Sequence, residues 1–137
     1  MTQKVLAIDD DPAMTELLTL LLKSHGFDVL TANSGVDGVA ITQKDPPDVI
    51  ILDLMMPDMD GWQVCNQIRT FSNVPIVVIS ALDSPGMVAG VLDAGADDYL
   101  VKPVPSGVLI AHLNKLTRRA SMNSGNKFIP RVAPASV

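Results

Sequence analysis

The chain has 137 residues, of which 47% are apolar and 18% are charged, and its net charge is -5. This length allows one domain with one hydrophobic core, and the composition excludes a chain that is disordered throughout. An acidic protein of this kind has no electrostatic footprint for nucleic acid. Because the apolar runs are far shorter than the roughly 20 residues of a bilayer span and no signal-peptide pattern is present, we expect a cytoplasmic protein without membrane contact.

Five short apolar runs, rich in β-branched residues, recur along the chain and predict strands. They are Lys4–Ile8, Asp28–Ala32, Asp48–Asp53, Pro75–Ser80 and Asp97–Val101. Stretches with helical periodicity separate these runs. The first predicted helix follows Asp11 and Pro12, which are an N-cap residue and a proline at the first helical position, and it ends near Gly26.

The later predicted helices are marked by caps and apolar positions. These markers are Ser34 for the second helix, Asp60 for the third, Gly95 after the fourth and Leu109–Leu116 within the fifth. The fourth helix starts with Ser84, Pro85 and Gly86, which are poor helix formers. We therefore expect a mobile or shortened segment there.

The alternation of strands and helices predicts an α/β fold made of parallel βαβ units with right-handed crossovers. Val49–Leu52 and Ile76–Ile79 are continuous apolar runs, as in central strands that are covered on both faces. We therefore predict a single-domain, doubly wound, five-stranded parallel sheet over residues 1–119. Residues 120–137 are rich in Ser, Asn, Gly and Pro without periodicity, which predicts a linker or disordered tail.

Polar side chains follow most of the predicted strands at their carboxyl ends. Asp9 and Asp10 follow the first strand, Asp53 closes the third, Ser80 closes the fourth and Lys102 follows the fifth. In an open α/β sheet, ligands bind beyond these ends, where the strand order reverses. If the strand order is 2-1-3-4-5, the first and third strands are neighbours, and their three carboxylates converge in one crevice.

Converging carboxylates repel one another and do not all stay ionised unless a cation joins them. Mg²⁺ prefers oxygen ligands and suits a shallow site that also takes a phosphate oxygen, whereas no neighbouring histidine or thiol suggests zinc. Lys102 adds a positive charge and Ser80 a hydroxyl. These groups are the parts required for Mg²⁺-dependent phosphoryl transfer to an aspartate.

Four motifs in this order resemble the receiver domain of two-component response regulators, over about residues 3–119. They are Ile8–Pro12, Val49–Gly61, Ser80–Ala81 and Gly95–Pro103. The resemblance implies a flavodoxin-like (βα)5 fold with strand order 2-1-3-4-5. It also implies a phosphoacceptor that assists its own phosphorylation and dephosphorylation, and not an enzyme.

The resemblance further implies a role for each residue of the crevice. Asp53 would be the phosphoacceptor, which takes a phosphoryl group from a sensor histidine kinase or a phosphotransfer protein. Asp9, Asp10, Asp53 and the main-chain carbonyl of Met55 would bind Mg²⁺. Lys102 would pair with the phosphoryl group, and its peptide bond to the next proline would be cis.

Two residues of this pattern would act as a switch. Ser80 would move to hydrogen-bond the phosphoryl group, and Tyr99 would follow by turning inward. The face formed by the fourth helix, the fifth strand and the fifth helix would then signal to an output protein or domain. Charges on this face fit homodimerisation, but Val108 and His112 depart from the usual pattern, so a monomer and a weak phosphorylation-dependent homodimer both remain open. The charges concerned are Asp93, Asp97, Asp98, Arg118 and Arg119.

Three other functions are alternatives. The chain could be the front module of a longer DNA-binding transcriptional regulator whose output domain is absent. An aspartate-nucleophile phosphatase normally needs a second acid two residues after the nucleophile, where this chain has Met55. A flavin or nucleotide carrier would need a Gly-rich or Ser-rich loop after the first strand, where this chain has three aspartates and a proline.

Overall fold

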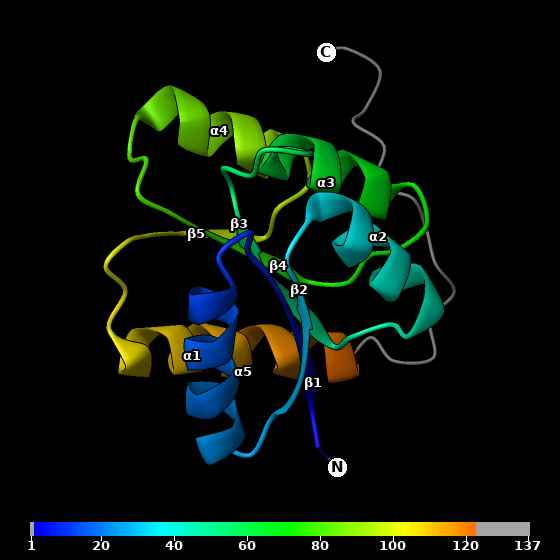
Figure 1. Cartoon of the computed structure of the whole chain (residues 1–137), viewed down its shortest axis with the longest axis vertical. Coiled ribbons are helices and arrows are strands. Elements are labelled where there is room, and N and C mark those ends of the chain that lie inside the picture. The colour runs from blue at the N-terminus through cyan, green and yellow to red at the C-terminus, as the bar shows by residue number, and fades with distance from the viewer. Residues whose placement is uncertain (1, 123–137) are drawn as a thin grey trace.

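Strands and helices alternate through residues 2–122, which are the residues described by the computed structural model (Figure 1). The strands are β1 (Lys4–Ile8), β2 (Asp28–Ala32), β3 (Val49–Asp53), β4 (Ile76–Ser80) and β5 (Asp98–Val101). The helices are α1 (Pro12–Ser24), α2 (Gly35–Lys44), α3 (Gly61–Arg69), α4 (Pro85–Asp93) and α5 (Ser106–Met122). Each predicted strand is present, and β3, β4 and β5 begin one residue later than predicted.

The strands form one parallel sheet in the order β2-β1-β3-β4-β5, which confirms the predicted topology. Ile8 at the end of β1 lies opposite Leu52, and Asp53 at the end of β3 lies opposite Ile79. The carboxyl ends of the three central strands therefore meet at one edge of the sheet. This register brings residues that are far apart in the sequence into one site.

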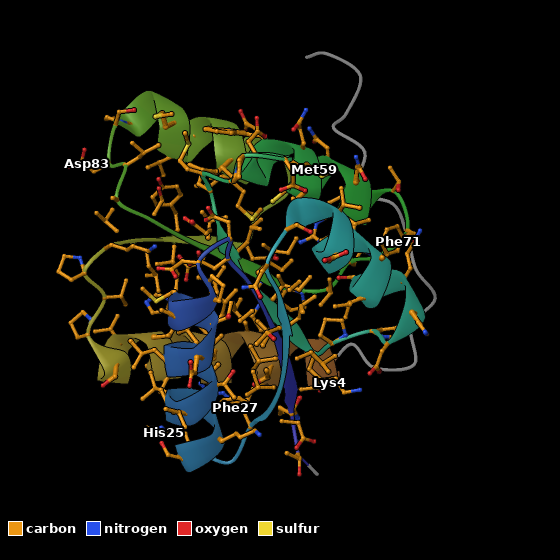
Figure 2. All side chains as sticks on the ribbon, in the orientation of Figure 1. Lys4, His25, Phe27, Met59, Phe71 and Asp83 are labelled. Carbon is orange, nitrogen blue, oxygen red and sulfur yellow. The ribbon has the colours of Figure 1, made fainter. Side chains whose placement is uncertain are left out.

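Helices cover both faces of the sheet: α1 and α5 lie on one face, and α2, α3 and α4 lie on the other (Figure 1). Side chains fill the spaces between these layers (Figure 2). Successive residues of a strand point to opposite layers. Val5 lies in the core on the side of α1 and α5, with Leu22 and Leu113, whereas Leu6 lies in the core on the other side, with Val64. Because both faces are covered, β3 and β4 are apolar at every position except their last, and full burial of one such apolar side chain contributes about 1.5–3 kcal/mol.

Polar caps set the starts of the helices. The carboxylate of Asp11 accepts a hydrogen bond of 3.0 Å from the backbone N–H of Ala13, so Asp11 caps α1 as predicted. Ser84 is the N-cap of α4, and Pro85 is its first residue, a position where proline is tolerated because no intrahelical N–H bond is lost. Ser84 and Pro85 therefore begin the helix, and the mobility expected of this segment stays a prediction.

The last helix passes the predicted domain boundary. Helix α5 extends to Met122, beyond Arg119, because the sequence has no glycine or proline to end it before Gly125. The rest of the predicted linker, residues 123–137, lies outside the described residues. Within the described part of the chain, none of the helices combines the length and the apolar character that crossing a bilayer requires.

Candidate functional site

Three aspartates converge at the carboxyl edge of the sheet. Asp9 and Asp10 follow β1, and Asp53 ends β3. One carboxylate oxygen from each of the three lies within 4.8 Å of the other two. Because β1 and β3 are hydrogen-bonded neighbours, their ends lie side by side, and the structure brings together the residues that strand order alone predicted to meet.

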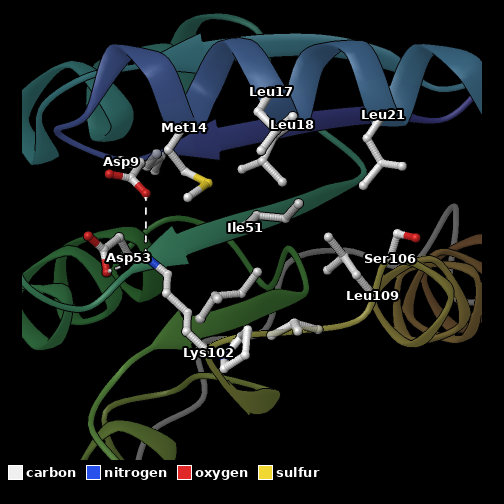
Figure 3. A pocket seen from close by; sticks show the side chains of 14 residues that line it. Asp9, Met14, Leu17, Leu18, Leu21, Ile51, Asp53, Lys102, Ser106 and Leu109 are labelled. Carbon is white, nitrogen blue, oxygen red and sulfur yellow. Dashed lines mark ion pairs between the residues drawn. The ribbon is translucent and has the colours of Figure 1, made fainter.

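A single lysine faces two of these carboxylates (Figure 3). The Nζ atom of Lys102 lies 3.9 Å from an oxygen of Asp9 and 3.9 Å from an oxygen of Asp53. The backbone N–H of Lys102 donates a 2.8 Å hydrogen bond to the carbonyl of Ser80, which ties the lysine to the end of β4. The Lys102–Pro103 peptide bond is cis, as the resemblance implies.

The charges at this edge are only partly compensated. Asp9 is 5% exposed, and burial raises the pKa of its carboxyl, although the N–H of Asp11 and the charge of Lys102 oppose that effect. Burial also raises the pKa of Asp53, and the neighbouring charge of Asp9 raises it further. Since the ionised forms of both carboxyls are destabilised, a cation bound between them would be stabilising.

The chemistry of the donors fits a hard divalent cation. The clustered ligands are all carboxylate oxygens, which Mg²⁺ and Ca²⁺ prefer over nitrogen or sulfur. Met55 follows two residues after Asp53, and its backbone N–H lowers the pKa of the Asp53 carboxyl, against the larger opposing effects of burial and Asp9. The loop after β3 therefore folds against the phosphoacceptor candidate, next to the aspartate cluster.

The two predicted switch residues hold the same loop residue. Ser80, which is 1% exposed, accepts a 3.1 Å hydrogen bond at its hydroxyl oxygen from the backbone N–H of Leu82. The hydroxyl of Tyr99 donates a 2.6 Å hydrogen bond to the carbonyl of Leu82. A movement of Ser80 or of Tyr99 would therefore act on the same residue, Leu82, in the loop between β4 and α4.

An apolar cavity opens beside the aspartates. It has a volume of about 610 Å³ and lies between α1 and α5, with Asp9, Asp53 and Lys102 at one end (Figure 3). Its apolar lining includes Met14, Leu17, Leu18, Leu21, Pro103, Val104 and Leu109. Leu17 is 60% exposed. The sequence indicated α1 as a helix packed against the core, but it did not indicate that one edge of this apolar face stays open next to the site.

One residue of the site was not among the predicted ones. The side-chain amide of Asn33 donates hydrogen bonds of 2.8 Å to the carbonyl of Asp9 and 3.1 Å to the hydroxyl of Thr15. Asn33 directly follows β2, so it obeys the same rule that identified the other site residues. Applying that rule to all five strands would have found it.

Comparison with known proteins identifies the family. Residues 5–114 match the family model of the response regulator receiver domain. The chain belongs to this family. Response regulator MprA of Mycobacterium leprae (strain TN) is 44% identical over 117 residues, which are 85% of this chain and 51% of that protein. DNA-binding response regulator MtrA of Mycolicibacterium smegmatis (strain ATCC 700084 / mc(2)155) is 40% identical over 120 residues, 87% of this chain and 52% of that protein.

Solved structures agree with this assignment. The receiver domain of the Francisella response regulator 1452 has a TM-score of 0.82 and 34% sequence identity, over 86% of this chain and 98% of that one. The chain spans about half the length of the curated relatives described above. It is therefore similar to one module of those proteins, the receiver domain.

Two of the charges that the sequence assigned to the output face of this receiver, Asp97 and Asp98, are engaged within the chain. Asp98 contacts the ring nitrogen Nδ1 of His112, and the Nζ atom of Lys115 lies 3.9 Å from the same carboxylate. Asp97, which the sequence placed among the charges of this face, has a side chain that is 9% exposed and is paired with Arg69. Asp97 is therefore unsuited to pairing between copies, because its carboxylate faces the interior of its own domain.

Proposed function

We propose that this receiver accepts a phosphoryl group on Asp53 from a phosphohistidine of a sensor histidine kinase or a phosphotransfer protein. The observation that carries this proposal is the arrangement of Asp53 beside Lys102, with the carboxylates of Asp9 and Asp10 within 4.8 Å of its own. An acid at the end of a buried strand is costly unless a ligand compensates it. Membership of the receiver family supports the same role.

Asp9, Asp10, Asp53 and the main-chain carbonyl of Met55 would hold Mg²⁺. When bound, the ion supplies positive charge that lets an anionic phosphoryl group approach an acidic edge and that neutralises charge in the transition state. The raised pKa values of Asp9 and Asp53 support this assignment, because a site of like charges without a cation is electrostatically unfavourable.

In the transfer itself, a carboxylate oxygen of Asp53 forms a bond to phosphorus while the bond from phosphorus to the imidazole nitrogen breaks. The nitrogen keeps the electron pair and takes up a proton. Lys102, whose Nζ lies 3.9 Å from Asp53, is within reach to pair with an oxygen of the transferred group. Attack of water on phosphorus later returns the free carboxylate, so the chain assists its own phosphorylation and dephosphorylation without acting as a conventional enzyme.

The open cavity between α1 and α5 is the surface on which we expect the phosphodonor protein to dock. Asp53 and Lys102 line the same cavity as Leu17, Leu18 and Leu21, so a donor histidine delivered to Asp53 passes this apolar wall. Burial of the exposed Leu17 contributes to association, while the polar end sets the position of the histidine. The docking surface and the reacting group are therefore continuous.

Phosphorylation would be read through the loop between β4 and α4. A Ser80 hydroxyl that turns toward the phosphoryl group would strain its contact with the N–H of Leu82, whose carbonyl is held by Tyr99. Tyr99 would then turn inward, and the α4–β5–α5 face would change toward an output partner. The charge and acceptor oxygens of the phosphoryl group drive this change.

A second candidate is the receiver module of a longer DNA-binding transcriptional regulator. It is supported by relatives of which this chain matches only about half the length, and of these MtrA is described as DNA-binding. In that case an appended domain, and not this acidic segment, would contact DNA. A phosphatase has less support, because the position of its second acid is Met55.

The acceptor is tested by incubation with acetyl phosphate and Mg²⁺, followed by mass spectrometry of the intact protein. We expect one acid-labile phosphoryl group on the native chain and none on the Asp53→Asn variant. The matched control is Asp28→Asn, a substitution at the exposed start of β2, which should leave phosphorylation unchanged. Persistent labelling of Asp53→Asn would overturn the acceptor assignment.

A further inference from the structure

The loop that connects β3 to α3 carries Met55, and it is fixed at several points. The N–H of Gly61 donates a 2.7 Å hydrogen bond to the carbonyl of Leu54, which closes the loop at its base. Asp60 and Gln63 form a reciprocal capping box at the start of α3. Met56 is buried in the core, whereas the side chain of Met55 is exposed.

A further contact joins this loop to a different helix. The two carboxylate oxygens of Asp58 accept hydrogen bonds of 3.2 Å from the N–H of Gly35 and 3.1 Å from the N–H of Val36. Both donors belong to the first turn of α2, where free N–H groups and the helix dipole favour a negative charge. These bonds lower the pKa of the Asp58 carboxyl, so it is ionised at neutral pH.

We propose that Asp58 is a positioning residue for the magnesium site. By accepting hydrogen bonds from the start of α2, Asp58 holds the loop, and with it the Met55 carbonyl, in place. The inference rests on the proposed function, since it concerns the same Mg²⁺ ligands. Asp58 itself would not touch the ion. Its role would be to keep the loop from moving away from the aspartates when no ion is bound.

The start of α2 is also connected to the other half of the site. Asn33, which precedes α2, donates a 2.8 Å hydrogen bond to the carbonyl of Asp9. The side chain of Asn33 therefore contacts the Asp9 backbone, and the N–H groups of Gly35 and Val36 contact the Asp58 carboxylate. We call these contacts the strut, because they connect the end of β1 with the loop after β3, the two regions that would supply the Mg²⁺ ligands.

The strut has little room to shift. A Cβ atom added to Gly35 would lie 2.8 Å from the Cβ of Met59 and 2.9 Å from a methyl carbon of Val64, so the α2 backbone packs directly against the loop. Only glycine fits such a close approach. A rigid strut is what a site needs if its ligands come from separate loops, because groups beyond the direct ligands set their orientation.

The test is the Mg²⁺ affinity of the full chain, measured by titration and followed by amide NMR shifts. We expect Asp58→Ala to weaken Mg²⁺ binding about tenfold, the lower end for loss of an outer-shell partner of a metal site. Asp58→Asn keeps one acceptor oxygen and should give an intermediate affinity. The same measurement on the native chain separates the two proposals, since native protein without a Mg²⁺ response at Asp9, Asp10 and Asp53 would refute the proposed function itself.

Ser34→Ala is the matched control. Ser34 caps the same end of α2 through a 3.1 Å hydrogen bond from the N–H of Asp37, but it does not hold the loop. We expect Ser34→Ala to lower the melting temperature as Asp58→Ala does, and to leave Mg²⁺ affinity unchanged. Equal affinities for the native chain and Asp58→Ala, or equal losses in Asp58→Ala and Ser34→Ala, would overturn the positioning role.

A double substitution tests the strut directly. If Asn33 and Asp58 act through one segment, Asn33→Ala should weaken Mg²⁺ binding in the native background and have little further effect in Asp58→Ala. Independent losses whose fold-changes multiply would show that the two contacts do not form one strut.

Discussion

Buried charges lie at both edges of the sheet, and the two edges treat them differently. At the amino ends of β4 and β5, Arg69 and Asp97 form an ion pair of 2.9 Å, with side chains that are 6% and 9% exposed. At the carboxyl ends, Lys102 stands 3.9 Å from both Asp9 and Asp53. The first pair has one charge of each sign in close contact, whereas the second group has excess negative charge.

Hydrogen bonds complete the difference. Arg69 also donates to the carbonyls of Gly95 and Ser72, at 3.0 and 3.1 Å, and Asp97 accepts a 2.8 Å bond from the N–H of Ile76. The carboxyl edge instead raises the pKa values of Asp9 and Asp53. At the amino edge, the charges are balanced by the protein's own side chains. At the carboxyl edge, the excess negative charge favours binding of a cation, which in turn allows a phosphoryl group to approach.

Removing the Arg69–Asp97 ion pair at the amino edge should have the largest effect on stability. Asp97→Ala leaves the guanidinium of Arg69 buried without its carboxylate, so the free energy of unfolding should fall by about 3–5 kcal/mol. Urea denaturation followed by circular dichroism measures it. Asp45→Ala removes the exposed pair with Lys4, whose atoms are 2.6 Å apart, and should change stability little. A similar loss in both variants would mean that burial does not distinguish these pairs.

Mg²⁺ binding at the carboxyl edge should change the free energy of unfolding by a smaller amount, in the opposite direction. Mg²⁺ at 100 times its dissociation constant should raise the free energy of unfolding of the native chain by about 2.7 kcal/mol, because it binds only the folded state. Asp97→Ala should keep this gain, since its defect lies at the other edge.

The same stability measurement with Mg²⁺ tests whether Asp10 is a ligand of the ion. Asp10→Ala removes one of the clustered carboxylates, so at that Mg²⁺ concentration it should show little of the gain. Parallel denaturation curves with and without Mg²⁺ provide the measurement. A full gain in Asp10→Ala would remove that residue from the site.

The comparison also shows what a sequence can predict. Strand ends were predictable to within one residue, because the apolar β-branched runs stop abruptly at a polar residue. Since parallel strands share their carboxyl edge, the strand order then brought Asp9, Asp10 and Asp53 together. The site could be predicted because each residue is attached to a regular element whose direction is fixed.

The contacts made by loops were not predictable in this way. Asp97 looked like a surface charge, and only the packing of α3 against the connection between α4 and β5 reveals that Arg69 reaches it. For Asp58, nothing in the local sequence indicated that α2 donates to its carboxylate. Such partners depend on how loops fold over neighbouring elements, and the periodicity of the chain does not record that.

The smallest predicted effect concerns the charge stored at the carboxyl edge. Burial and the charge of Asp9 raise the pKa of Asp53, so its ionised form destabilises the folded state at any pH above that raised pKa. Without Mg²⁺, Asp53→Asn should therefore be more stable than the native chain at neutral pH, by about 0.5–2 kcal/mol, the usual range for a single stabilising substitution.

This advantage should depend on pH in a defined direction. As the pH falls through the raised folded pKa toward 3.8, the ordinary pKa of an aspartate, the native Asp53 takes up a proton and loses its penalty, so the two stability curves should converge. Thermal unfolding of both proteins across this range measures the difference, with Asp28→Asn as a control that should show none. A difference that is constant with pH would mean that the substitution acts through packing, and the carboxyl edge would then store no electrostatic strain for phosphorylation to release.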